Sequence, residues 1–470
     1  MTHPILPELT ALLGVAHVLI GADRAAYLSD WTGHYTSDPL AVLRPADTAQ
    51  VVAVMRLAAA HGVPVVPASG RTGLVGGLYT QGGLMLSVER LNRIEAINPT
   101  TRTATVGAGV ILSRLHEAAA DQGLYFPLWF GARGSAMIGG VLSTNAGGSN
   151  VLRYGSTRAL CLGLEVVLAD GRVLNLMSAL HKDNTGYDLK DLFIGAEGTL
   201  GVITRAVMKL VPAPRAHATA TLAARSLPDA LVLLNQLQEA TGGLVEAFEY
   251  MPASYMRRLA EARPDVSEPF QPRPEVTLLV ELGATAPRDC TPVPDGSLPL
   301  TTLLEEVLAA QMEQGLVLDA LVAQTEAQRR AMWERRELAA EITFARRPLI
   351  DTDIALPLDQ VAPLLAAFEA RLPALDTQAE TLAVAHLGDG NVHLTIFPGH
   401  EDAALADAVV EMLEEEVLRH GGTFSAEHGV GLSKKRSMAR RKDPVALEVM
   451  RQIKAALDPA GLMNPGKVIP

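Results

Sequence analysis

Two short stretches combine histidine, carboxylate and glycine in a pattern that could bind a metal. Residues 386–393 read HLGDGNVH, and residues 425–431 read SAEHGVG. A glycine-rich turn would let His386, at the end of one strand, approach His393 on the next, while Glu427 would supply an oxygen ligand. Two imidazoles and one carboxylate that leave coordination positions open are typical of a catalytic divalent site. The alternative is that one histidine caps the turn and the other packs in the core.

Three glycine-rich stretches predict a second kind of site. The first, PASGRTGLVGG at 67–77, has glycines spaced so that backbone N–H groups can form an anion-binding concavity. It matches neither the dinucleotide fingerprint G-x-G-x-x-G nor the phosphate-binding G-K-[ST] motif, and a surface loop is the alternative. Residues 131–158 are rich in small polar residues without any acidic one, and residues 184–204 repeat the glycine spacing. Together the three stretches predict one extended, phosphorylated, partly apolar ligand.

The elements that must position these residues follow two patterns along the chain. Up to about Pro214, strands alternate with loops and with helices predicted over 48–61 and 112–122, and Asp170-Gly171 predicts a hairpin turn. Beyond it, the alternation predicts an antiparallel sheet with helices on one face, an α+β domain. We therefore place a domain boundary near Pro214.

Composition excludes several classes of function. The chain has 470 residues, 48% of them hydrophobic, and a formal net charge of -12, which disfavours binding to nucleic acid. Its two cysteines, Cys161 and Cys290, are too few for a disulfide framework and fit a reducing compartment. The N-terminal residues predict a helix rather than a signal peptide, and no apolar run is long enough to span a membrane. We expect a cytoplasmic protein.

The glycine-rich stretches resemble a known flavoprotein superfamily. PVVPASGRTGLVGG, IGGVLSTNAGG with YG following, and DLFIGAEGTLGVIT are similar to the FAD-binding domain of the vanillyl-alcohol oxidase / p-cresol methylhydroxylase superfamily. HLGDGNVH, SAEHGVG and LMNPGKVIP resemble its FAD-linked D-2-hydroxyacid dehydrogenases, which act on D-lactate, glycolate or D-2-hydroxyglutarate. The resemblance runs in order over residues 35–470. It implies an α+β fold in three parts. Residues 1–214 would form a two-part FAD-binding domain, and residues 215–424 a ferredoxin-like α+β domain that binds substrate and metal. Residues 425–470 would form a helical C-terminal segment that completes the active site and returns to the flavin.

The resemblance also implies which residues hold FAD. The first loop would bind the pyrophosphate, the next two stretches would line the flavin and its adenosine arm, and the tail would close over the isoalloxazine. The corresponding residues are Ser69, Gly70, Arg71, Thr72, Gly73, Leu74, Gly76, Gly139, Gly140, Asn145, Gly147, Gly148, Glu197, Gly198, Gly201, Ile203 and Asn464. Relatives that attach flavin covalently use a histidine in the first loop, where this chain has ASGRTG, so non-covalent FAD is implied.

With the resemblance added, we expect a divalent metal on His386, His393 and Glu427, with Zn²⁺ as the default and Mn²⁺ or Fe²⁺ as alternatives. The metal would acidify the substrate hydroxyl, and the adjacent His428 would accept its proton while C2 gives a hydride to the flavin. A supporting role for His428 beside Glu427 is the alternative. By resemblance, Arg336 in WERREL would bind the substrate carboxylate. Alternatively, this arginine lies on a solvated helix face.

Two departures from the family pattern bear on the substrate. Asp351 stands where dicarboxylate-specific relatives place a lysine, and Ala340 stands where a hydroxyl residue would be expected. These differences argue against specificity for 2-hydroxyglutarate. The expected partners are a small anionic 2-hydroxy acid, a second copy in a homodimer, and an electron acceptor that is a quinone, an electron-transfer flavoprotein or a cytochrome.

Three rival functions use some of the same residues. A metal-dependent hydrolase would use the histidines and Glu427 but would leave the glycine-rich stretches unexplained. A flavin-binding electron-transfer subunit would be yellow but would not be reduced by a hydroxy acid. An oxidase that reduces O₂ directly would share every motif.

Overall fold

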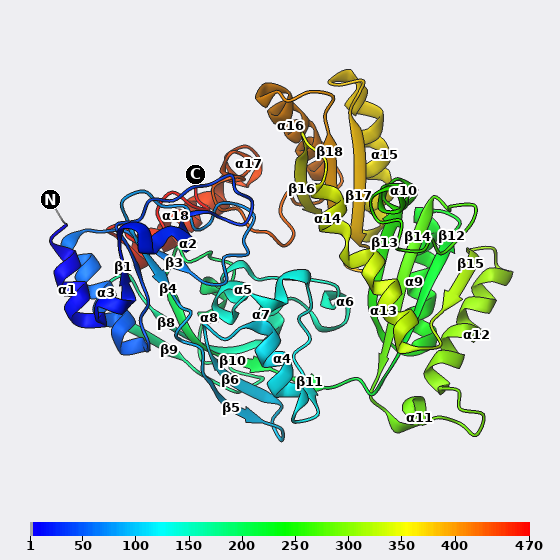
Figure 1. The fold of residues 1–470 in the computed structure, drawn as a ribbon, viewed down its shortest axis with the longest axis horizontal. Coiled ribbons are helices and arrows are strands. Elements are labelled where there is room, and N and C mark those ends of the chain that lie inside the picture. The colour runs from blue at the N-terminus through cyan, green and yellow to red at the C-terminus, as the bar shows by residue number, and fades with distance from the viewer. Residues whose placement is uncertain (1–2) are drawn as a thin grey trace. The chain divides into compact units, whose positions relative to one another are not determined.

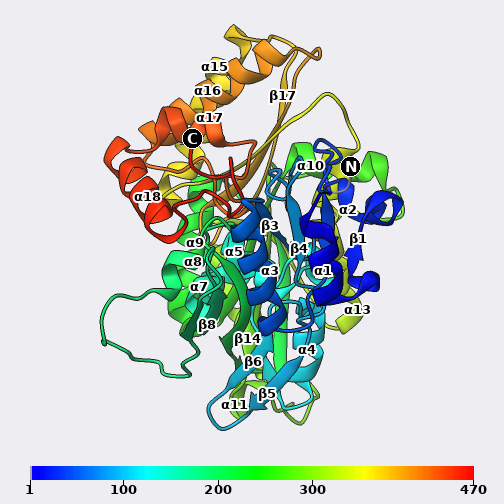
Figure 2. The same ribbon diagram turned by 90° about the vertical axis from the view of Figure 1, so that its left-hand side faces the viewer.

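The computed structural model describes residues 3–470, and these divide into two compact units. Among the described residues, the first unit contains 3–147, 155–212 and 427–470, and the second contains 148–154 and 213–426. Figure 1 shows the elements of both units, and Figure 2 shows them from a second direction. Within the described residues, no helix has both the length and the apolar character needed to cross a membrane.

The first unit contains two main sheets. One has the order β1-β2-β4-β3, with β2 and β3 both parallel to β4, and the other is an antiparallel sheet of order β5-β6-β10-β8-β9. The strands are β1 (Val18–Leu19), β2 (Ala41–Leu43), β3 (Val65–Ala68), β4 (Leu84–Ser87), β5 (Ile94–Asn98), β6 (Thr103–Gly107), β8 (Cys161–Val167), β9 (Val173–Leu176) and β10 (Val202–Lys209), and the short strands β7 (Leu124–Tyr125) and β11 (Val211–Pro212) form a separate pair.

The helices of the first unit connect and flank these sheets. They are α1 (Ile5–Leu13), α2 (Ala25–Leu28), α3 (Thr48–His61), α4 (Leu112–Ala120), α5 (Ile138–Thr144), α7 (Thr157–Leu160), α8 (Lys190–Phe193), α17 (Lys435–Arg441) and α18 (Pro444–Leu457). The prediction for α3 is confirmed at both ends, because Asp47 caps its N-terminus and Gly62 ends it in a left-handed conformation. The hairpin at Asp170-Gly171 joins β8 to β9 as predicted.

The second unit contains a seven-stranded antiparallel sheet of order β15-β12-β14-β13-β17-β18-β16. Its strands are β12 (Ala216–Ala224), β13 (Val245–Pro252), β14 (Val276–Ala284), β15 (Val317–Val322), β16 (Ile350–Ala355), β17 (Glu380–His386) and β18 (Asn391–Phe397). Its helices are α6 (Val151–Tyr154), α9 (Leu227–Thr241), α10 (Ala253–Ala262), α11 (Pro287–Cys290), α12 (Pro299–Glu313), α13 (Glu326–Glu337), α14 (Ala339–Phe344), α15 (Val361–Arg371) and α16 (Ala403–Arg419).

Helices cover both faces of this sheet, so the expectation of helices on one face is wrong. The larger core packs one face against α9, α12, α15 and α16 and includes Leu233, Leu304 and Phe368. A smaller core packs α10, α13 and α14 against the other face and includes Tyr255 and Met332. The helices of this second layer are short, and α13 is rich in charged residues. Their apolar residues therefore do not stand out as a helical periodicity in the sequence. The α+β fold class itself is confirmed.

The first turn of α13 gives a test of local stability. Thr325 forms a capping box with Gln328, in which each side chain bonds the other residue's backbone N–H. We expect Thr325→Ala to lower the free energy of unfolding by about 1 kcal/mol and to speed amide exchange in this turn. Thr302→Ala on α12 is the control, because that exposed hydroxyl bonds only the backbone carbonyl of Leu298, four residues earlier, and makes no capping box. Equal exchange in both variants would contradict the capping role.

Candidate functional site

The first glycine-rich loop follows β3 and is held against the second glycine-rich stretch. The hydroxyl of Ser69 accepts a hydrogen bond from the backbone N–H of Gly140 at 3.0 Å. A Cβ on Gly70 would lie 2.2 Å from the carbonyl oxygen of Ser135, so only glycine fits there. Arg71 has a positive φ of 58° and places its guanidinium over the ring of Tyr27, 4.6 Å from the centroid. The two stretches therefore form one backbone surface.

At two positions of this loop, neither packing nor backbone conformation within the protein requires glycine. Among the described residues, no atom lies within 4 Å of the position that a Cβ on Gly73 would take, and the nearest atom to such a Cβ on Gly77 is Glu197 Oε2 at 3.9 Å. Neither has a positive φ. By contrast, Gly139 packs on Ala108 and Gly201 on Val166, where a Cβ would collide with the neighbour. Open space at Gly73 and Gly77 is what a bound ligand that approaches the backbone would require.

The C-terminal tail closes on the same loops. The carboxylate of Glu197 accepts hydrogen bonds from the backbone N–H groups of Val430 and Gly431 at 2.7 and 2.8 Å. Burial raises the pKa of Glu197, although these two hydrogen bonds oppose the shift. Asn464 donates from Nδ2 to the carbonyl oxygens of Gly77 and Glu197, at 3.1 and 2.8 Å. Its Oδ1 is buried without a hydrogen-bond partner in residues 3–470, so one strong acceptor is left for a ligand.

The remaining residues predicted to bind the cofactor have different roles in the structure of the protein itself. Asn145 has a φ of 51° and accepts a hydrogen bond from the backbone N–H of Arg158 at 2.9 Å. Gly198 has a φ of 71° beside Pro67, and Ile203 is buried in β10. Thr72 and Leu74 are half-buried in the first loop, and Gly76, with a φ of 69°, packs against Tyr35. Gly148 is the first residue of the segment that belongs to the second unit.

Glu427 and His428 begin the C-terminal segment of the first unit. A Cβ on Gly147 would lie 2.5 Å from Glu427 Oε1, so this glycine makes room for the carboxylate. A Cβ on Gly429 would likewise meet Glu197 at 2.8 Å. Ala426, the residue before Glu427, belongs to the second unit and donates its backbone N–H to Asp353 Oδ2 at 3.2 Å. One peptide bond therefore joins a residue fixed on the sheet to a residue fixed beside the glycine-rich loops.

In the second unit, the β17–β18 hairpin brings His386 and His393 together. Their positions are diagonal in the register, since His386 lies opposite Asn391 and His393 lies opposite Val384. The two rings are 5.4 Å apart between centroids and nearly perpendicular, at 80°. Gly390, with a φ of 80°, allows the turn between the strands. The predicted convergence of these side chains is therefore present in the hairpin.

A buried carboxylate, Glu249 on β13, holds both His386 and Arg336. Glu249 Oε2 lies 2.8 Å from His386 Nδ1 and 2.8 Å from Arg336 Nε, and its side chain is 0% exposed. Burial would raise the pKa of Glu249, but the charges and hydrogen bonds of His386 and Arg336 hold it at about 2. A carboxylate that accepts a hydrogen bond from Nδ1 fixes the tautomer and orientation of the ring, an arrangement typical of metal-binding histidines.

Arg336 does not lie on a solvated helix face, which was the alternative interpretation. It is buried, with 8% of its surface exposed, and α13 is fixed above the sheet by a second buried carboxylate. Glu281 accepts hydrogen bonds from Arg329, at 2.7 Å from both Nε and Nη2, and from Trp333 Nε1 at 2.8 Å. Arg329, Trp333 and Arg336 follow helical spacing, so Glu281 sets the position of the arginine one turn later.

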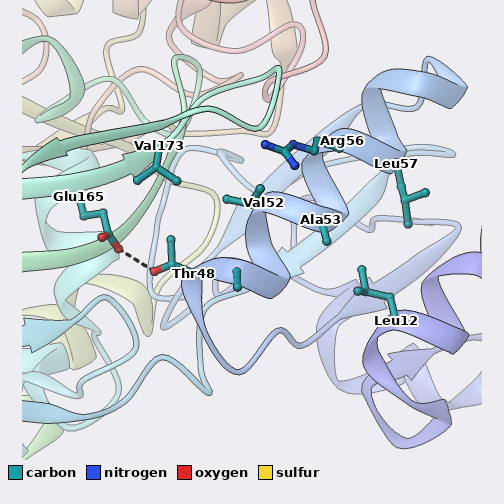
Figure 3. A pocket seen from close by; sticks show the side chains of 9 residues that line it. Leu12, Thr48, Val52, Ala53, Arg56, Leu57, Glu165 and Val173 are labelled. Carbon is teal, nitrogen blue, oxygen red and sulfur yellow. Dashed lines mark hydrogen bonds between the residues drawn. The ribbon is translucent and has the colours of Figure 1, made fainter.

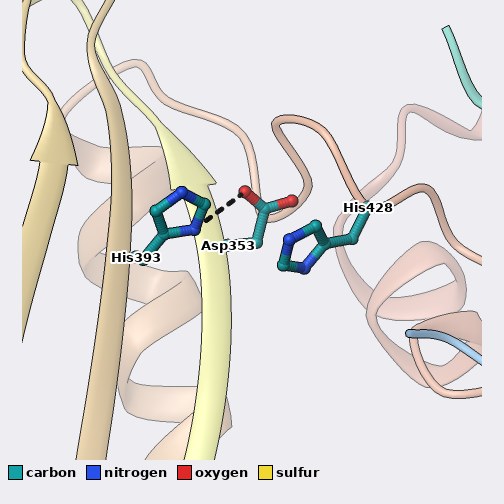
Figure 4. Close-up of side chains that lie close together, drawn as sticks. All are labelled: Asp353, His393 and His428. Atoms are coloured by element: carbon teal, nitrogen blue, oxygen red, sulfur yellow. Dashed lines mark ion pairs between the residues drawn. The ribbon is translucent and has the colours of Figure 1, made fainter. Parts of the chain in front are cut away.

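His393 has its own carboxylate neighbour. Asp353 on β16 lies directly opposite His393, with Oδ1 3.8 Å from Nδ1, and is 0% exposed (Figure 4). Asn391 donates from Nδ2 to the same oxygen at 2.9 Å, which fixes the carboxylate. Sequence reasoning missed Glu249 and Asp353. Each is one of two acidic residues in a largely apolar strand, LVEAFEY or LIDTDIALP, and that signal could have identified them.

A groove elsewhere in the first unit contains none of the predicted site residues. It has a volume of about 780 Å³, and Figure 3 shows Thr48 bonded to Glu165 at 2.6 Å on its wall. Its lining residues are Leu12, Thr48, Ala49, Val52, Ala53, Arg56, Leu57, Glu165 and Val173. Glu165 is also bonded by Thr204 at 2.8 Å, so its carboxylate serves the packing of the unit.

Two family models match successive parts of the chain. Residues 39–177 match an FAD binding domain, and residues 213–468 match the C-terminal domain of FAD linked oxidases. A D-2-hydroxyglutarate dehydrogenase of Stutzerimonas stutzeri (strain A1501) is 35% identical over 100% of this chain and 99% of its own length. The mitochondrial D-2-hydroxyglutarate dehydrogenase of Bos taurus is 36% identical over 94% of this chain and 79% of its own.

Solved structures show the same fold at low identity. A p-cresol methylhydroxylase has a TM-score of 0.73 at 16% identity and covers 98% of this chain and 96% of its own. An alkyldihydroxyacetonephosphate synthase also has a TM-score of 0.73, at 14% identity, covering 99% and 85%. The chain therefore belongs to the FAD-linked oxidases, and it is an FAD-dependent oxidoreductase.

Proposed function

We propose that this enzyme oxidises a D-2-hydroxy acid to the 2-oxo acid, with FAD as the hydride acceptor. The observation that carries the proposal is the position of Glu427, whose carboxylate fills the space left by Gly147 in a predicted flavin loop. A polar group with the chemistry of a metal ligand is thus fixed beside the cofactor loops. The names of the two relatives, which match along nearly the whole chain, support the same class of substrate.

We propose that FAD is held non-covalently by the three glycine-rich stretches and the tail. The first loop, from Ser69 to Gly76, contains no histidine that could form a covalent bond with the flavin. Gly73 and Gly77 leave open space, and Asn464 Oδ1 supplies an unused acceptor, so these residues fit a large ligand with polar and phosphate groups. Bound FAD would accept the hydride from C2 of the substrate.

We propose that His386, His393 and Glu427 hold a divalent metal, with Zn²⁺ as the default. The donor set fits, because His386 presents Nε2 once Glu249 has engaged Nδ1, and His393 lies beside it on the next strand. A divalent cation would supply Lewis acidity that makes the substrate hydroxyl easier to deprotonate. The proposed roles of the chain's own groups follow from that chemistry.

Two further side chains complete the proposed reaction. His428 takes the hydroxyl proton, because imidazole can accept a proton near neutral pH, and the C2 hydride leaves in the same oxidation. Arg336 binds the substrate carboxylate through its Nη atoms, since its Nε is already engaged by Glu249. The two electrons then pass from the flavin to an acceptor, for which a quinone, an electron-transfer flavoprotein or a cytochrome is chemically suitable.

Two substrates of the proposed class are favoured by different observations. The names of the relatives favour D-2-hydroxyglutarate. Asp351 favours a monocarboxylate such as D-lactate, because it follows the strand periodicity of Asp353 and adds a carboxylate to the sheet face that carries His393. The Thr395 hydroxyl donates to Asp351 Oδ1 at 3.0 Å. A second substrate carboxylate near Asp351 would be repelled by like charge.

Anaerobic titration tests the proposed function. We expect D-lactate or D-2-hydroxyglutarate to bleach the visible absorbance of the bound flavin, and the L-enantiomers to leave it unchanged. Asp351→Lys should shift the preference toward D-2-hydroxyglutarate, because it replaces a negative charge with a positive one. A flavin that no D-2-hydroxy acid reduces, although dithionite does, would contradict the proposal and favour an electron-transfer subunit.

Elemental analysis tests the metal. We expect His393→Ala to lose most of the bound metal per mole of protein while it retains FAD, because the flavin loops lie in other segments of the chain. His400→Ala is the matched control, since this exposed histidine lies just past the same strand. Equal metal content in the two variants would remove His393 from the site.

Stopped-flow reduction separates the base from the carboxylate-binding residue. We expect His428→Ala to keep FAD and metal but to reduce its flavin about 10²- to 10⁴-fold more slowly at saturating substrate. Arg336→Lys should mainly weaken substrate binding, because it keeps a cation beside the buried Glu249 but loses the planar fork. Wild-type reduction rates in His428→Ala would refute its assignment as the base.

A further inference from the structure

The turn at residues 464–468, which we call the tail turn, contains a buried lysine. Lys467 has only 5% of its surface exposed. Its Nζ donates to the carbonyl oxygen of Pro465 at 3.0 Å, and no carboxylate among residues 3–470 forms an ion pair with it. A buried ammonium is costly unless an anion accompanies it. The proposed chemistry assigns this cation no role.

The charged group that acts on Lys467 is a second cation. Lys435, at the start of α17, is half-buried, and its positive charge is felt at Lys467. Burial, followed by the charge of Lys435, lowers the pKa of Lys467 to about 8, so the ammonium is still the main form at pH 7. The electrostatics therefore favour a ligand that brings a negative charge to Lys467.

The backbone of the tail turn is strained beside Lys467. Val468 has a φ of 62°, an outlier for a β-branched residue, and Ile469 N–H donates to the carbonyl oxygen of Lys467 at 2.7 Å. Val468 N–H donates to the carbonyl oxygen of Gly431 at 3.0 Å, and Gly431 N–H donates to Glu197 Oε2 at 2.8 Å. Such strain costs roughly 1–3 kcal/mol and persists only where the surroundings fix the backbone. The backbone that carries Lys467 is therefore held in place.

The tail turn lies against the predicted flavin loops of its own unit. Asn464 donates from Nδ2 to the carbonyl oxygens of Gly77, in the first loop, and Glu197, in the third glycine-rich stretch. Residues 427–470 and both of these stretches belong to the first unit. Lys467 and the flavin loops are therefore fixed to one another within a single unit.

The two polar groups that the tail turn leaves for a ligand differ in kind. Asn464 Oδ1 is a buried acceptor without a hydrogen-bond partner in the described chain, whereas Lys467 Nζ is a charged donor. Pyrophosphate oxygens could accept from Lys467 but have no N–H to offer Asn464. The pyrimidine edge of a flavin has an N3–H donor between two carbonyl oxygens, so it can satisfy both groups.

We propose that Lys467 binds the pyrimidine edge of the flavin and offsets the negative charge that the ring gains on reduction. The inference rests on the proposed binding of FAD by the glycine-rich stretches and the tail, but not on the identity of the substrate. A hydride brings two electrons and one proton, so the ring gains one negative charge, which is concentrated at N1 and the C2 carbonyl. A cation at this edge favours the reduced ring and raises the reduction potential of bound FAD.

Redox titration of the full-length FAD enzyme tests this inference, with xanthine oxidase and a reference dye supplying electrons in place of a hydroxy acid. We expect Lys467→Met to weaken binding of reduced FAD, relative to oxidised FAD, about tenfold or more, which lowers the two-electron midpoint potential by about 30 mV or more. Lys467→Arg keeps the charge and should remain near the wild-type potential. Lys442→Met is the matched control, because it removes one exposed lysine just after α17, and its potential should not change.

A further measurement needs no variant, so it applies even if Lys467→Met does not fold. The midpoint potential of the wild-type bound flavin should be more positive than that of free FAD in the same buffer, and a more negative value would overturn the proposal. If Lys467→Met weakens binding of oxidised and reduced FAD equally, the potential stays unchanged, and Lys467 binds the pyrophosphate instead of the ring. Unchanged affinity and potential would remove Lys467 from the FAD site. The proposed oxidation stands in each case, because no hydroxy acid takes part in the titration.

Discussion

The candidate site depends on one buried negative charge. Glu249 is completely inaccessible to solvent, and a carboxylate in that position is stable only because His386 and Arg336 both face it. The same pairing explains why two residues from distant segments, one on β17 and one on α13, have defined orientations. Removing either partner would leave an ion with half of its compensation in a region that cannot rehydrate it. The part of the candidate site that lies on the seven-stranded sheet is therefore organised around this carboxylate.

In the glycine-rich stretches, the arrangement of the chain depends on close packing rather than on charge. Its glycines serve three separate purposes: some turn the backbone, some admit a neighbouring segment, and Gly73 and Gly77 do neither. Gly147 belongs to the second group, because its missing side chain is replaced by the carboxylate of Glu427. Much of the glycine in these stretches is thus required by internal packing, and a count of glycines cannot separate these positions from those predicted to contact the cofactor.

The sequence predicted local features well and tertiary ones poorly. The ends of α3 and the hairpin that joins β17 to β18 could be predicted because capping residues and turn glycines act over a few residues. The second helical layer, and the carboxylates of Glu249 and Asp353, could not be assigned because their meaning depends on strands far away in sequence. Gly388 shows the difference: its place in a turn was predictable, but its contact with Leu152 was not.

The path of the backbone determines which of the two units can finish folding first during synthesis. The strand β3 bonds the C-terminal tail, with Val65 N–H donating to the carbonyl of Leu462 and Asn464 N–H donating to that of Val65. On a ribosome, residues 213–426 emerge and can fold before the partner of β3 has been synthesised. Nearly four hundred residues separate the two sides of this contact, so the unit that matches the FAD binding domain is completed last, although it also contains α1.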